Sequence, residues 1–343
     1  MKICKLCILP ETFPGISFNA AGVCNHCQRF DGKAEKLLDE KKACKRKFHE
    51  LLSQQVNKPR NHSGPAARRA YDVLMAYSGG KDSTYTMALL KNKYRLRILA
   101  VTFDNGFLSE TARTNIGTVT DKLGIDHICY KPGWKNLKKI FSAAAEREFY
   151  AKKTLERAST ICTSCMGIVK SACLKMAIEM DIPLTAYGWS PGQAPLESAI
   201  MKNNPAFVRS AQQAILKPLR EIIGQEIEAY FLTDRHYADA ERFPYNIHPM
   251  AWEFYNESMI VEEIQKLGWK APHDTDSNST NCLLNAFAND IHIRKYGFHP
   301  YVWEIANMVR EGVMTREEGY QKIYADQPQE FINAAKEKLL KSA

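Results

Sequence analysis

The feature that most constrains this chain is a short polar turn, Tyr-Ser-Gly-Gly-Lys-Asp-Ser at residues 77–83. The apolar run at 73–76 indicates a buried strand, and residues 84–90 indicate the first turns of a helix. Because Gly79 and Gly80 have no Cβ, the backbone can turn tightly there and approach a ligand closely. The N–H groups of the first helical turn then point at that ligand, with the helix dipole behind them. The turn therefore predicts a phosphate site between a strand and a helix.

The side chains of the turn fit the same chemistry. Ser78 and Ser83 supply hydroxyl donors, and Lys81 can add a positive charge. Asp82 can cap the helix or hold Mg²⁺ against a nucleotide. Serine, glycine and aspartate are also common in ordinary β-to-α turns, which is the simpler interpretation.

The full run at 78–83 lacks the spacing of a Walker A loop. It resembles instead the PP-loop of the N-type ATP pyrophosphatases. The resemblance implies that ATP is cleaved between its α and β phosphates, that pyrophosphate sits in the loop, and that AMP passes to a substrate oxygen. It also implies an ATP site made of Tyr77, Ser78, Gly79, Gly80, Lys81, Asp82 and Ser83.

Composition narrows the class of protein. The 343 residues are 45% hydrophobic and 25% charged, as expected of a soluble globular protein. We expect a cytoplasmic protein without a membrane span, because we find no signal-peptide core and no apolar run near the roughly 20 residues that a span requires. The net charge of +9 suits an anionic substrate such as a nucleotide, a sugar nucleotide, an acidic sugar or RNA. The ten cysteines indicate metal binding or reactivity rather than disulfides.

Four of the cysteines form two Cys-x-x-Cys pairs near the N-terminus, Cys4 with Cys7 and Cys24 with Cys27. This spacing is typical of a ribbon or treble-clef zinc site, in which each knuckle brings two thiolates to one ion. Few apolar residues lie between the pairs, so the metal must stabilise the unit. We predict a zinc-binding unit over residues 1–30 that is closed to catalysis, because protein supplies all four ligands.

The middle of the chain alternates strand and helix patterns. This alternation predicts an α/β fold with a doubly wound parallel sheet. A helical linker is predicted at 31–70, the ATP pyrophosphatase domain at 71–235, and a mostly helical C-terminal region at 236–343. The expected strands are 72–77, 97–103, 127–130 and 184–187; the expected helices include 33–52, 162–180, 225–232, 304–311 and 315–324; a flexible linker is expected at 57–67 and a rigid loop at 243–249.

Ligands of such sheets bind at the carboxyl ends of the strands, near the point where the strand order reverses. We therefore expect the PP-loop, residues 102–106 and residues 188–193 to meet. Phe103 can stack on or wall the adenine, and Asp104 can accept from the ribose or the base amine, although Asp-Asn-Gly is also an ordinary turn sequence. The loop that begins at Gly188 is expected to close over the nucleotide or the substrate.

Two further cysteines, Cys162 and Cys165, open the helix predicted at 162–180. A cysteine at a helix N-terminus has a lowered pKa and is reactive or able to bind metal. The Cys-x-x-Cys spacing lets both sulfurs reach one ion or form a redox pair. A second concentration of polar residues, at 274–282, ends in Cys282 and has the pattern of a site loop that caps a helix.

Separate motifs along the chain form a set: the N-terminal cysteine pairs in their setting at 4–27, the PP-loop at 78–83, Cys162-Thr-Ser-Cys165, and Gly-Val-Met-Thr-Arg-Glu-Glu at 312–318. In this order they resemble the N-acetyl sugar amidotransferases of lipopolysaccharide and nonulosonic-acid biosynthesis. The resemblance implies that the acetamido group of a sugar becomes an acetamidino group. The amide oxygen is adenylated, ammonia from a partner glutaminase attacks, and AMP leaves with the oxygen.

The polar loop that ends in Cys282 departs from that family. Cys162, Cys165 and Cys282 instead resemble the three-cysteine arrangement of the PP-loop sulfurtransferases that thiolate tRNA. This second resemblance implies that three thiolates hold a [4Fe–4S] cluster with one iron open to sulfide, so that sulfur displaces the adenylated oxygen. The alternatives are a zinc ion on the three cysteines, or a Cys282 that is merely buried.

Three functions therefore stay open at the level of sequence. The first is an ATP-dependent enzyme that transfers nitrogen to an N-acetyl sugar, and the second is a sulfurtransferase acting on tRNA or a small molecule. The third is a non-catalytic zinc-containing module that binds nucleotide or RNA, against which the intact PP-loop argues. The expected cofactors are ATP, Mg²⁺, Zn²⁺ and, for sulfur transfer, [4Fe–4S]. The expected catalytic residues are Lys81, Asp82, Cys162, Cys165 and Cys282.

Overall fold

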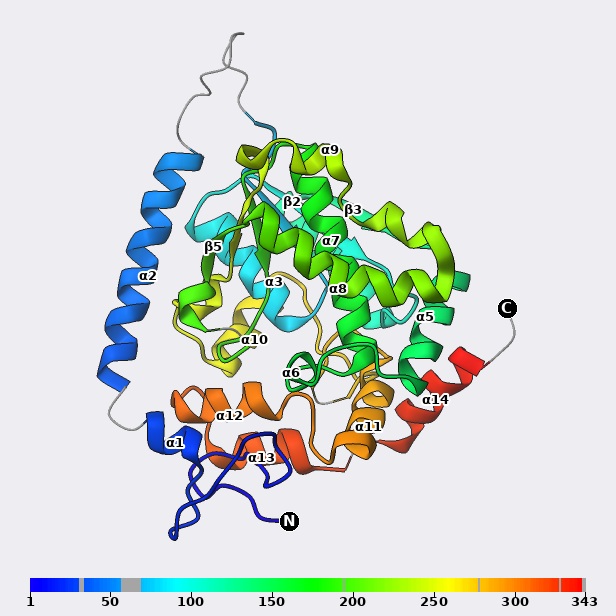
Figure 1. Ribbon diagram of the computed structural model, residues 1–343. Helices are drawn as coiled ribbons and strands as arrows, with labels where there is room; N and C mark the ends of the chain where they lie inside the picture. Colours follow the sequence, from blue (N-terminus) through cyan, green and yellow to red (C-terminus); the bar gives the residue numbers. More distant parts are fainter. Residues whose placement is uncertain (31–33, 57–68, 194, 277, 327, 341–343) are drawn as a thin grey trace.

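The computed structural model describes residues 1–30, 34–56, 69–193, 195–276, 278–326 and 328–340, and the linker predicted at 57–67 falls outside them. A sheet lies at the centre, surrounded by helices, and the N-terminal unit lies against the helices of the C-terminal region (Figure 1). The strands are β1 Val73–Ala76, β2 Ile98–Phe103, β3 Asp126–Tyr130, β4 Leu184–Tyr187, β5 Ile200–Lys202 and β6 Tyr245–Ile247.

The sheet has six strands in the order β3-β2-β1-β4-β6-β5. Every neighbouring pair is parallel except β5 with β6, which is antiparallel. The chain continues from β1 to β2 on one side and later returns to place β4 on the other side. The turn after β1 therefore lies where the strand order reverses, which is the usual ligand position of such sheets. The predicted doubly wound α/β fold and its four predicted strands are confirmed.

Two strands were not expected from the sequence pattern. The rigid loop predicted at 243–249 is wrong, because Tyr245–Ile247 forms β6 and pairs in parallel with β4. The three residues of β6 are too few to show an alternating pattern, so the strand depends on its partners. The helix predicted at 225–232 is a 3₁₀ helix, Gly224–Tyr230. The domain boundary predicted at residue 235 stays a prediction, although β6 comes from beyond it.

The helices fall into three groups along the chain. The first two lie before the sheet: α1 Asn25–Phe30 and α2 Ala34–Gln55. Those of the α/β part are α3 Lys81–Ala88, α4 Glu110–Leu123, α5 Trp134–Glu146, α6 Lys152–Leu155, α7 Thr160–Glu179, α8 Pro205–Ile223 and α9 Asp234–Tyr237. The C-terminal region contributes α10 Glu257–Gln265, α11 Asn285–Tyr296, α12 Val302–Arg310, α13 Arg316–Tyr324 and α14 Gln329–Leu340.

Helix α7 is the central helix of the α/β part and contacts β1, β4, α5 and α8. It is the one described helix that is long and apolar enough to cross a membrane, so the expectation that no apolar run approaches that length is wrong here. Its side chains Leu174, Ala177 and Ile178 are buried inside the protein. A core helix meets the same criterion, and the packing explains the composition of α7 without a membrane.

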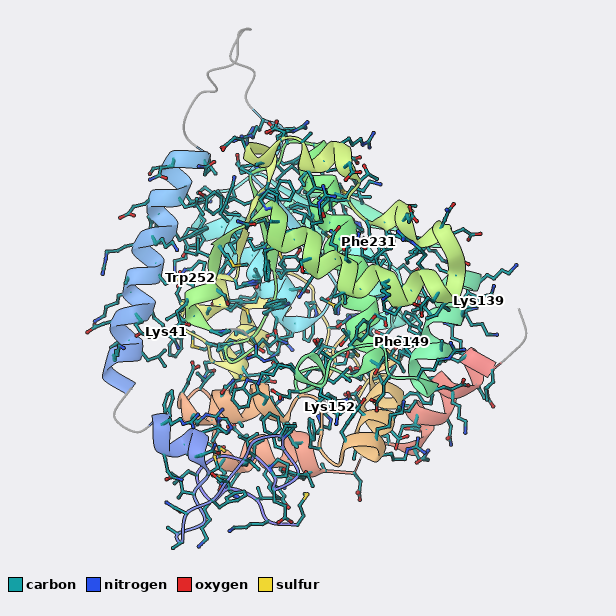
Figure 2. All side chains as sticks on the ribbon, viewed as in Figure 1. Lys41, Lys139, Phe149, Lys152, Phe231 and Trp252 are labelled. Carbon is teal, nitrogen blue, oxygen red and sulfur yellow. The ribbon has the colours of Figure 1, made fainter. Side chains whose placement is uncertain are left out.

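Helix α2 lies along one side of the molecule and corresponds to the helix predicted at 33–52 (Figure 1). Its buried Phe48 packs against Trp252, with the ring centroids 5.1 Å apart. Lys41, on the same side of the molecule, forms an ion pair with Glu311 at 3.4 Å (Figure 2). The basic residues of α2 are therefore in part engaged with the body of the protein.

The N-terminal unit packs on α12 and α13 (Figure 1). The ring of Phe13 stacks on Trp303 of α12, with centroids 5.4 Å apart and planes 8° apart. The guanidinium of Arg316, at the start of α13, donates to the carbonyl oxygens of Cys4 and Cys7, each at 3.1 Å. The unit therefore supports the two helices that also form one wall of the candidate site.

Candidate functional site

The PP-loop turn lies at the carboxyl end of β1 and opens α3. Gly79 has a φ of +75°, and a Cβ there would lie 2.6 Å from the carbonyl oxygen of Ala112, so the position requires glycine. The hydroxyl oxygens of Ser78 and Ser83 are 3.0 Å apart. Ser83 also donates to the carbonyl of Gly80 at 3.1 Å. The hydroxyls predicted as ligand donors therefore also hold the shape of the turn.

A segment from the C-terminal region, residues 278–282, covers this turn. The backbone N–H of Lys81 donates to Thr280 Oγ1 at 2.9 Å. A Cβ on Gly80 would lie 2.8 Å from the same hydroxyl and 3.1 Å from Asn281 Oδ1. The helix N-terminus that the sequence assigns to phosphate is thus capped by the protein's own hydroxyl. An anion that uses the N–H of Lys81 must displace Thr280.

A cavity of about 210 Å³ adjoins the capped turn. The ammonium of Lys81 reaches into it, 2.8 Å from the hydroxyl of Tyr255, 3.3 Å from Asp82 and 3.4 Å from Glu257. Pockets for drug-sized ligands span roughly 300–1,000 Å³. The cavity is therefore smaller than a nucleotide needs while Thr280 caps the turn.

Glu304, from α12, supplies a partly buried carboxylate on the wall of the cavity. The hydroxyl of Ser190 donates to it, and the side chain of Gln193 forms a second hydrogen bond. Burial raises the pKa of Glu304 to about 7, and the charge of Asp82 acts in the same direction, while Lys81 opposes it. Near neutral pH this carboxyl group therefore exists in both protonation states.

Three cysteines from distant parts of the chain lie beside the same segment. Cys162 and Cys165 are in the first turns of α7, and Cys282 directly follows the segment that caps the PP-loop. The amide nitrogen of Asn105, just after β2, is 3.5 Å from the sulfur of Cys165 and 3.7 Å from that of Cys282. The structure therefore brings together the three cysteines that the sequence singled out.

Backbone hydrogen bonds on both sides of Cys282 fix its place. Ser109 donates to the carbonyl of Asn281 at 2.9 Å, and Leu283 donates to the carbonyl of Phe107 at 2.8 Å. The polar segment is thus held against the chain that follows β2. Cys282 is therefore anchored by its own neighbours in the chain as well as by its place beside Asn105.

The three cysteines are partly buried. Burial raises the pKa of Cys162 and Cys165 to about 12 and also raises that of Cys282. The lowered pKa expected at a helix N-terminus is therefore wrong for Cys162 and Cys165, because desolvation of the thiolate outweighs the helix N–H groups. A metal must displace the protons of these thiols when it binds.

The spacing of the sulfurs separates two kinds of metal site. Among the described residues, one group of cysteines has all its sulfurs within 4.8 Å of one another, and it is the N-terminal group. The sulfurs of Cys162, Cys165 and Cys282 are more widely spaced. One ion bound to all three would need them closer, whereas the ligands of an iron–sulfur cluster bind different irons. The three sulfurs as placed are therefore not grouped tightly enough for one zinc ion, and a larger cluster does not require that grouping.

The N-terminal cysteines fit one tetrahedral ion. The sulfurs of Cys4 and Cys27 are 3.8 Å apart, as are those of Cys7 and Cys24. Four sulfurs at about 2.3 Å from a zinc ion, at the corners of a tetrahedron, are about 3.8 Å from each other. His26 packs its ring edge-on against Trp303 and is outside this group of ligands. The four-cysteine metal site expected from the spacing is therefore formed.

Several predicted site residues lie outside the cavity. Tyr77 is buried beneath the turn, and Phe103 packs edge-on against Tyr130 with centroids 6.0 Å apart. Asp104 is buried and accepts from Arg113 at 3.0 Å. None of the three predicted residues lines the cavity described here. Their contacts with adenosine stay predictions, and Asp104 already has a cationic partner.

The loop that begins at Gly188 meets the PP-loop as expected. A Cβ on Gly188 would lie 2.3 Å from the Cα of Ser83, so the two backbones touch here. Gly188, Ser190 and Gln193 all line the cavity. This loop therefore joins the PP-loop to the carboxylate of Glu304.

Sequence reasoning missed three residues of the site. Thr280 lies in the polar run before Cys282, and that run was the available signal. Glu304 was assigned to a closing helix, where one acidic residue among several gave no signal. Tyr255, whose hydroxyl contacts Lys81, likewise gave no signal in the sequence.

Comparisons with known proteins are distant. No family model matches the chain. The uncharacterized protein MJ1599 of Methanocaldococcus jannaschii is 21% identical over 255 residues, which cover 74% of this chain and 72% of that protein. Among solved structures, the U34-tRNA thiolase NcsA from Methanococcus maripaludis with its [4Fe-4S] cluster is similar at 14% identity and a TM-score of 0.38, covering 100% of this chain and 90% of that chain. At these values no residue role is transferred from either protein.

Proposed function

We propose that this protein is an ATP-dependent sulfurtransferase. It adenylates a carbonyl oxygen of an acceptor and replaces that oxygen with sulfur, and Cys162, Cys165 and Cys282 hold an iron–sulfur cluster. The observation that carries the proposal is the contact of Asn105 with the sulfurs of Cys165 and Cys282, beside the segment that caps the PP-loop. Adenylation alone has no step that uses a group of three thiols.

The PP-loop performs the first half of the reaction. When Thr280 withdraws, the N–H of Lys81 and its neighbours in the first turn of α3 bind the phosphates that leave as pyrophosphate. The ammonium of Lys81 balances their charge from within the cavity. The oxygen of the acceptor attacks the α-phosphorus, which turns an inert carbonyl oxygen into part of a good leaving group, AMP.

The three cysteines serve the second half. A [4Fe–4S] cluster held by three thiolates supplies one iron without a protein ligand, which can bind sulfide. Asn105 directs its amide hydrogens at the sulfurs of Cys165 and Cys282 and so stabilises them as thiolates. Partial burial of the group limits the access of water, which would otherwise hydrolyse the adenylated acceptor.

Nitrogen transfer to an acetamido sugar uses the same first half but gives the three cysteines no role. It rests on the sequence motifs alone, and nothing among the described residues favours it over sulfur transfer. The acceptor is tRNA or a smaller anionic molecule, in keeping with the net charge of +9.

The decisive experiment begins with anaerobic purification and analysis of iron, zinc and acid-labile sulfide. We expect about four irons per chain on the three cysteines and about one zinc per chain at the N-terminus. The protein is then incubated with MgATP, sulfide or ammonia, and either total tRNA or UDP-N-acetylglucosamine. Release of AMP and pyrophosphate with a thiolated product supports the proposal. Iron-free protein that forms an amidino sugar from ammonia would establish nitrogen transfer instead.

A further inference from the structure

Glu304 is a partly buried carboxylate that the proposed reaction does not yet employ. We propose that Glu304 is the general base of the adenylation step and removes the N–H proton of the acceptor's amide group. This inference rests on the proposed ATP-dependent adenylation. It is independent of whether sulfur or nitrogen arrives in the second step.

The chemistry of the first step requires such a base. As the amide oxygen attacks the α-phosphorus, an O–P bond forms and the bond from the α-phosphorus to pyrophosphate breaks. The electron pair of the amide N–H bond moves to form a C=N bond, and its proton needs an acceptor. The carboxylate of Glu304 takes that proton, so the step balances without an additional reactant.

The position of Glu304 fits this role. It lies on the wall of the cavity that also exposes Lys81 of the PP-loop. The donors Ser190 and Gln193 come from the loop whose first residue, Gly188, touches the backbone of the PP-loop. The base and the phosphate site are therefore held at a fixed separation by one short loop.

Gln193 adds a second feature to the same wall. Its side chain forms a hydrogen bond with Glu304, and its buried Oε1 atom has no hydrogen-bond partner among the described residues. An acceptor atom buried without a partner costs about 1–3 kcal/mol, so it calls for a ligand that donates. A separate donor of the acceptor molecule, such as a hydroxyl beside the amide, can satisfy Gln193 and so hold the amide N–H toward Glu304.

The other acidic residues of the cavity are less suited to accept a proton. Asp82 pairs with Lys81 at 3.3 Å, and Glu257 lies 3.4 Å from Lys81 and 3.2 Å from Lys322. A proton added to either carboxylate would break an ion pair. The hydrogen-bond partners of Glu304, Ser190 and Gln193, are neutral, so Glu304 can gain and lose a proton without breaking an ion pair. Charged and titratable groups facing Glu304 are Lys81 and Asp82 from α3, Tyr255 and Glu257 at α10, Tyr301 at α12 and Lys322 from α13.

The test compares Glu304→Gln with the wild type. Pyrophosphate release is measured between pH 5 and 9 with MgATP and whichever probe, total tRNA or UDP-N-acetylglucosamine, supports turnover. A base works only when deprotonated, and the pKa of Glu304 is about 7. The wild-type rate is therefore expected to fall below that pH. In Glu304→Gln we expect a loss of about 10²- to 10⁴-fold and no such fall, with unchanged affinity for a non-hydrolysable ATP analogue.

Glu311→Gln is the matched control, since Glu311 follows the same helix but pairs with Lys41 outside the cavity. It is expected to keep the wild-type rate and pH profile. A Glu304→Gln variant that keeps the fall near pH 7, or loses ATP affinity in proportion to rate, would show that Glu304 is structural. Wild-type protein that releases no pyrophosphate with any probe would refute the proposed function itself.

A second measurement needs no acceptor. In protein labelled with ¹³C at the glutamate carboxyl carbon, the resonance lost in Glu304→Gln is followed against pH. A titration near pH 7 supports the inference. A titration near the ordinary glutamate value of about 4.3 would overturn it, because such a group is too weak a base for the step.

Discussion

The backbone N–H of Lys81 donates to the hydroxyl of Thr280 at 2.9 Å. This bond joins the N-terminus of α3 to a segment far along the chain, two residues before Cys282. It occupies the position that the phosphate of a nucleotide takes at such a turn. An anion that accepts from this N–H must therefore displace the hydroxyl of Thr280.

Replacement of this cap should tighten nucleotide binding. Thr280→Val keeps the shape of the side chain but removes the acceptor, so the bound nucleotide no longer competes with it. One net hydrogen bond contributes about 0.5–1.5 kcal/mol, which corresponds to about 2- to 10-fold in the dissociation constant. Calorimetry with a non-hydrolysable ATP analogue measures the change.

The exposed Thr114 of α4 serves as the control, and Thr114→Val should leave the affinity unchanged. A Thr280→Val variant with unchanged or weaker affinity would show that Thr280 does not compete with the nucleotide.

The three central cysteines should hold iron independently of the ATP site. Replacement of Cys162, Cys165 or Cys282 by serine removes one thiolate, and we expect loss of iron, of acid-labile sulfide and of sulfur transfer. Affinity for the ATP analogue should stay within about 2-fold, because these residues do not line the cavity. Iron analysis and visible absorption of anaerobic protein measure the first effect, and calorimetry measures the second.

Cys173→Ala is the matched control for that series. Cys173 lies on the same helix, α7, and is buried in a separate apolar cluster. Its replacement should leave the iron content unchanged. Equal iron in wild type and Cys282→Ser would remove the basis for the cluster.

The N-terminal metal should also affect the distant cavity. Structural zinc contributes roughly 10–16 kcal/mol of apparent binding free energy in small zinc units, so Cys24→Ser should unfold residues 1–30 locally. Phe13 stacks on Trp303, next to Glu304. Unfolding of residues 1–30 should therefore remove this contact and lower the protection of α12 against hydrogen exchange. Hydrogen exchange of α12 and metal analysis measure the two effects, with Cys44→Ser on α2 as the control. Unchanged protection of α12 in the zinc-free variant would disprove this link.

The sequence predicted those parts of the site whose residues lie close together in the chain. Gly79 and Gly80 follow a strand and precede a helix, and Cys4 and Cys7 form one knuckle, so the chain itself brings these residues together. Contacts between distant segments were beyond such reasoning. Thr280 meets Lys81, and Glu304 meets Ser190, only because α3, α12 and the loop after β4 converge at one edge of the sheet.

The contact between Gly188 and Ser83 gives the last prediction, which concerns stability. A Cβ on Gly188 would lie 2.3 Å from the Cα of Ser83, and backbone atoms cannot move aside as the end of a side chain can. Gly188→Ala should therefore lower the free energy of unfolding by about 1–3 kcal/mol and weaken binding of the ATP analogue, because it pushes the PP-loop away.

Gly117 is the control for that substitution because it lies inside α4 and a Cβ there meets nothing within 4 Å. Gly117→Ala should raise the free energy of unfolding by about 0.5–1 kcal/mol, since alanine favours the helix over glycine. Urea denaturation of both variants measures the two opposite shifts. Equal stability of Gly188→Ala and wild type would mean that the two backbones do not touch, and the loop could then no longer hold Glu304 at a fixed distance from the phosphate site.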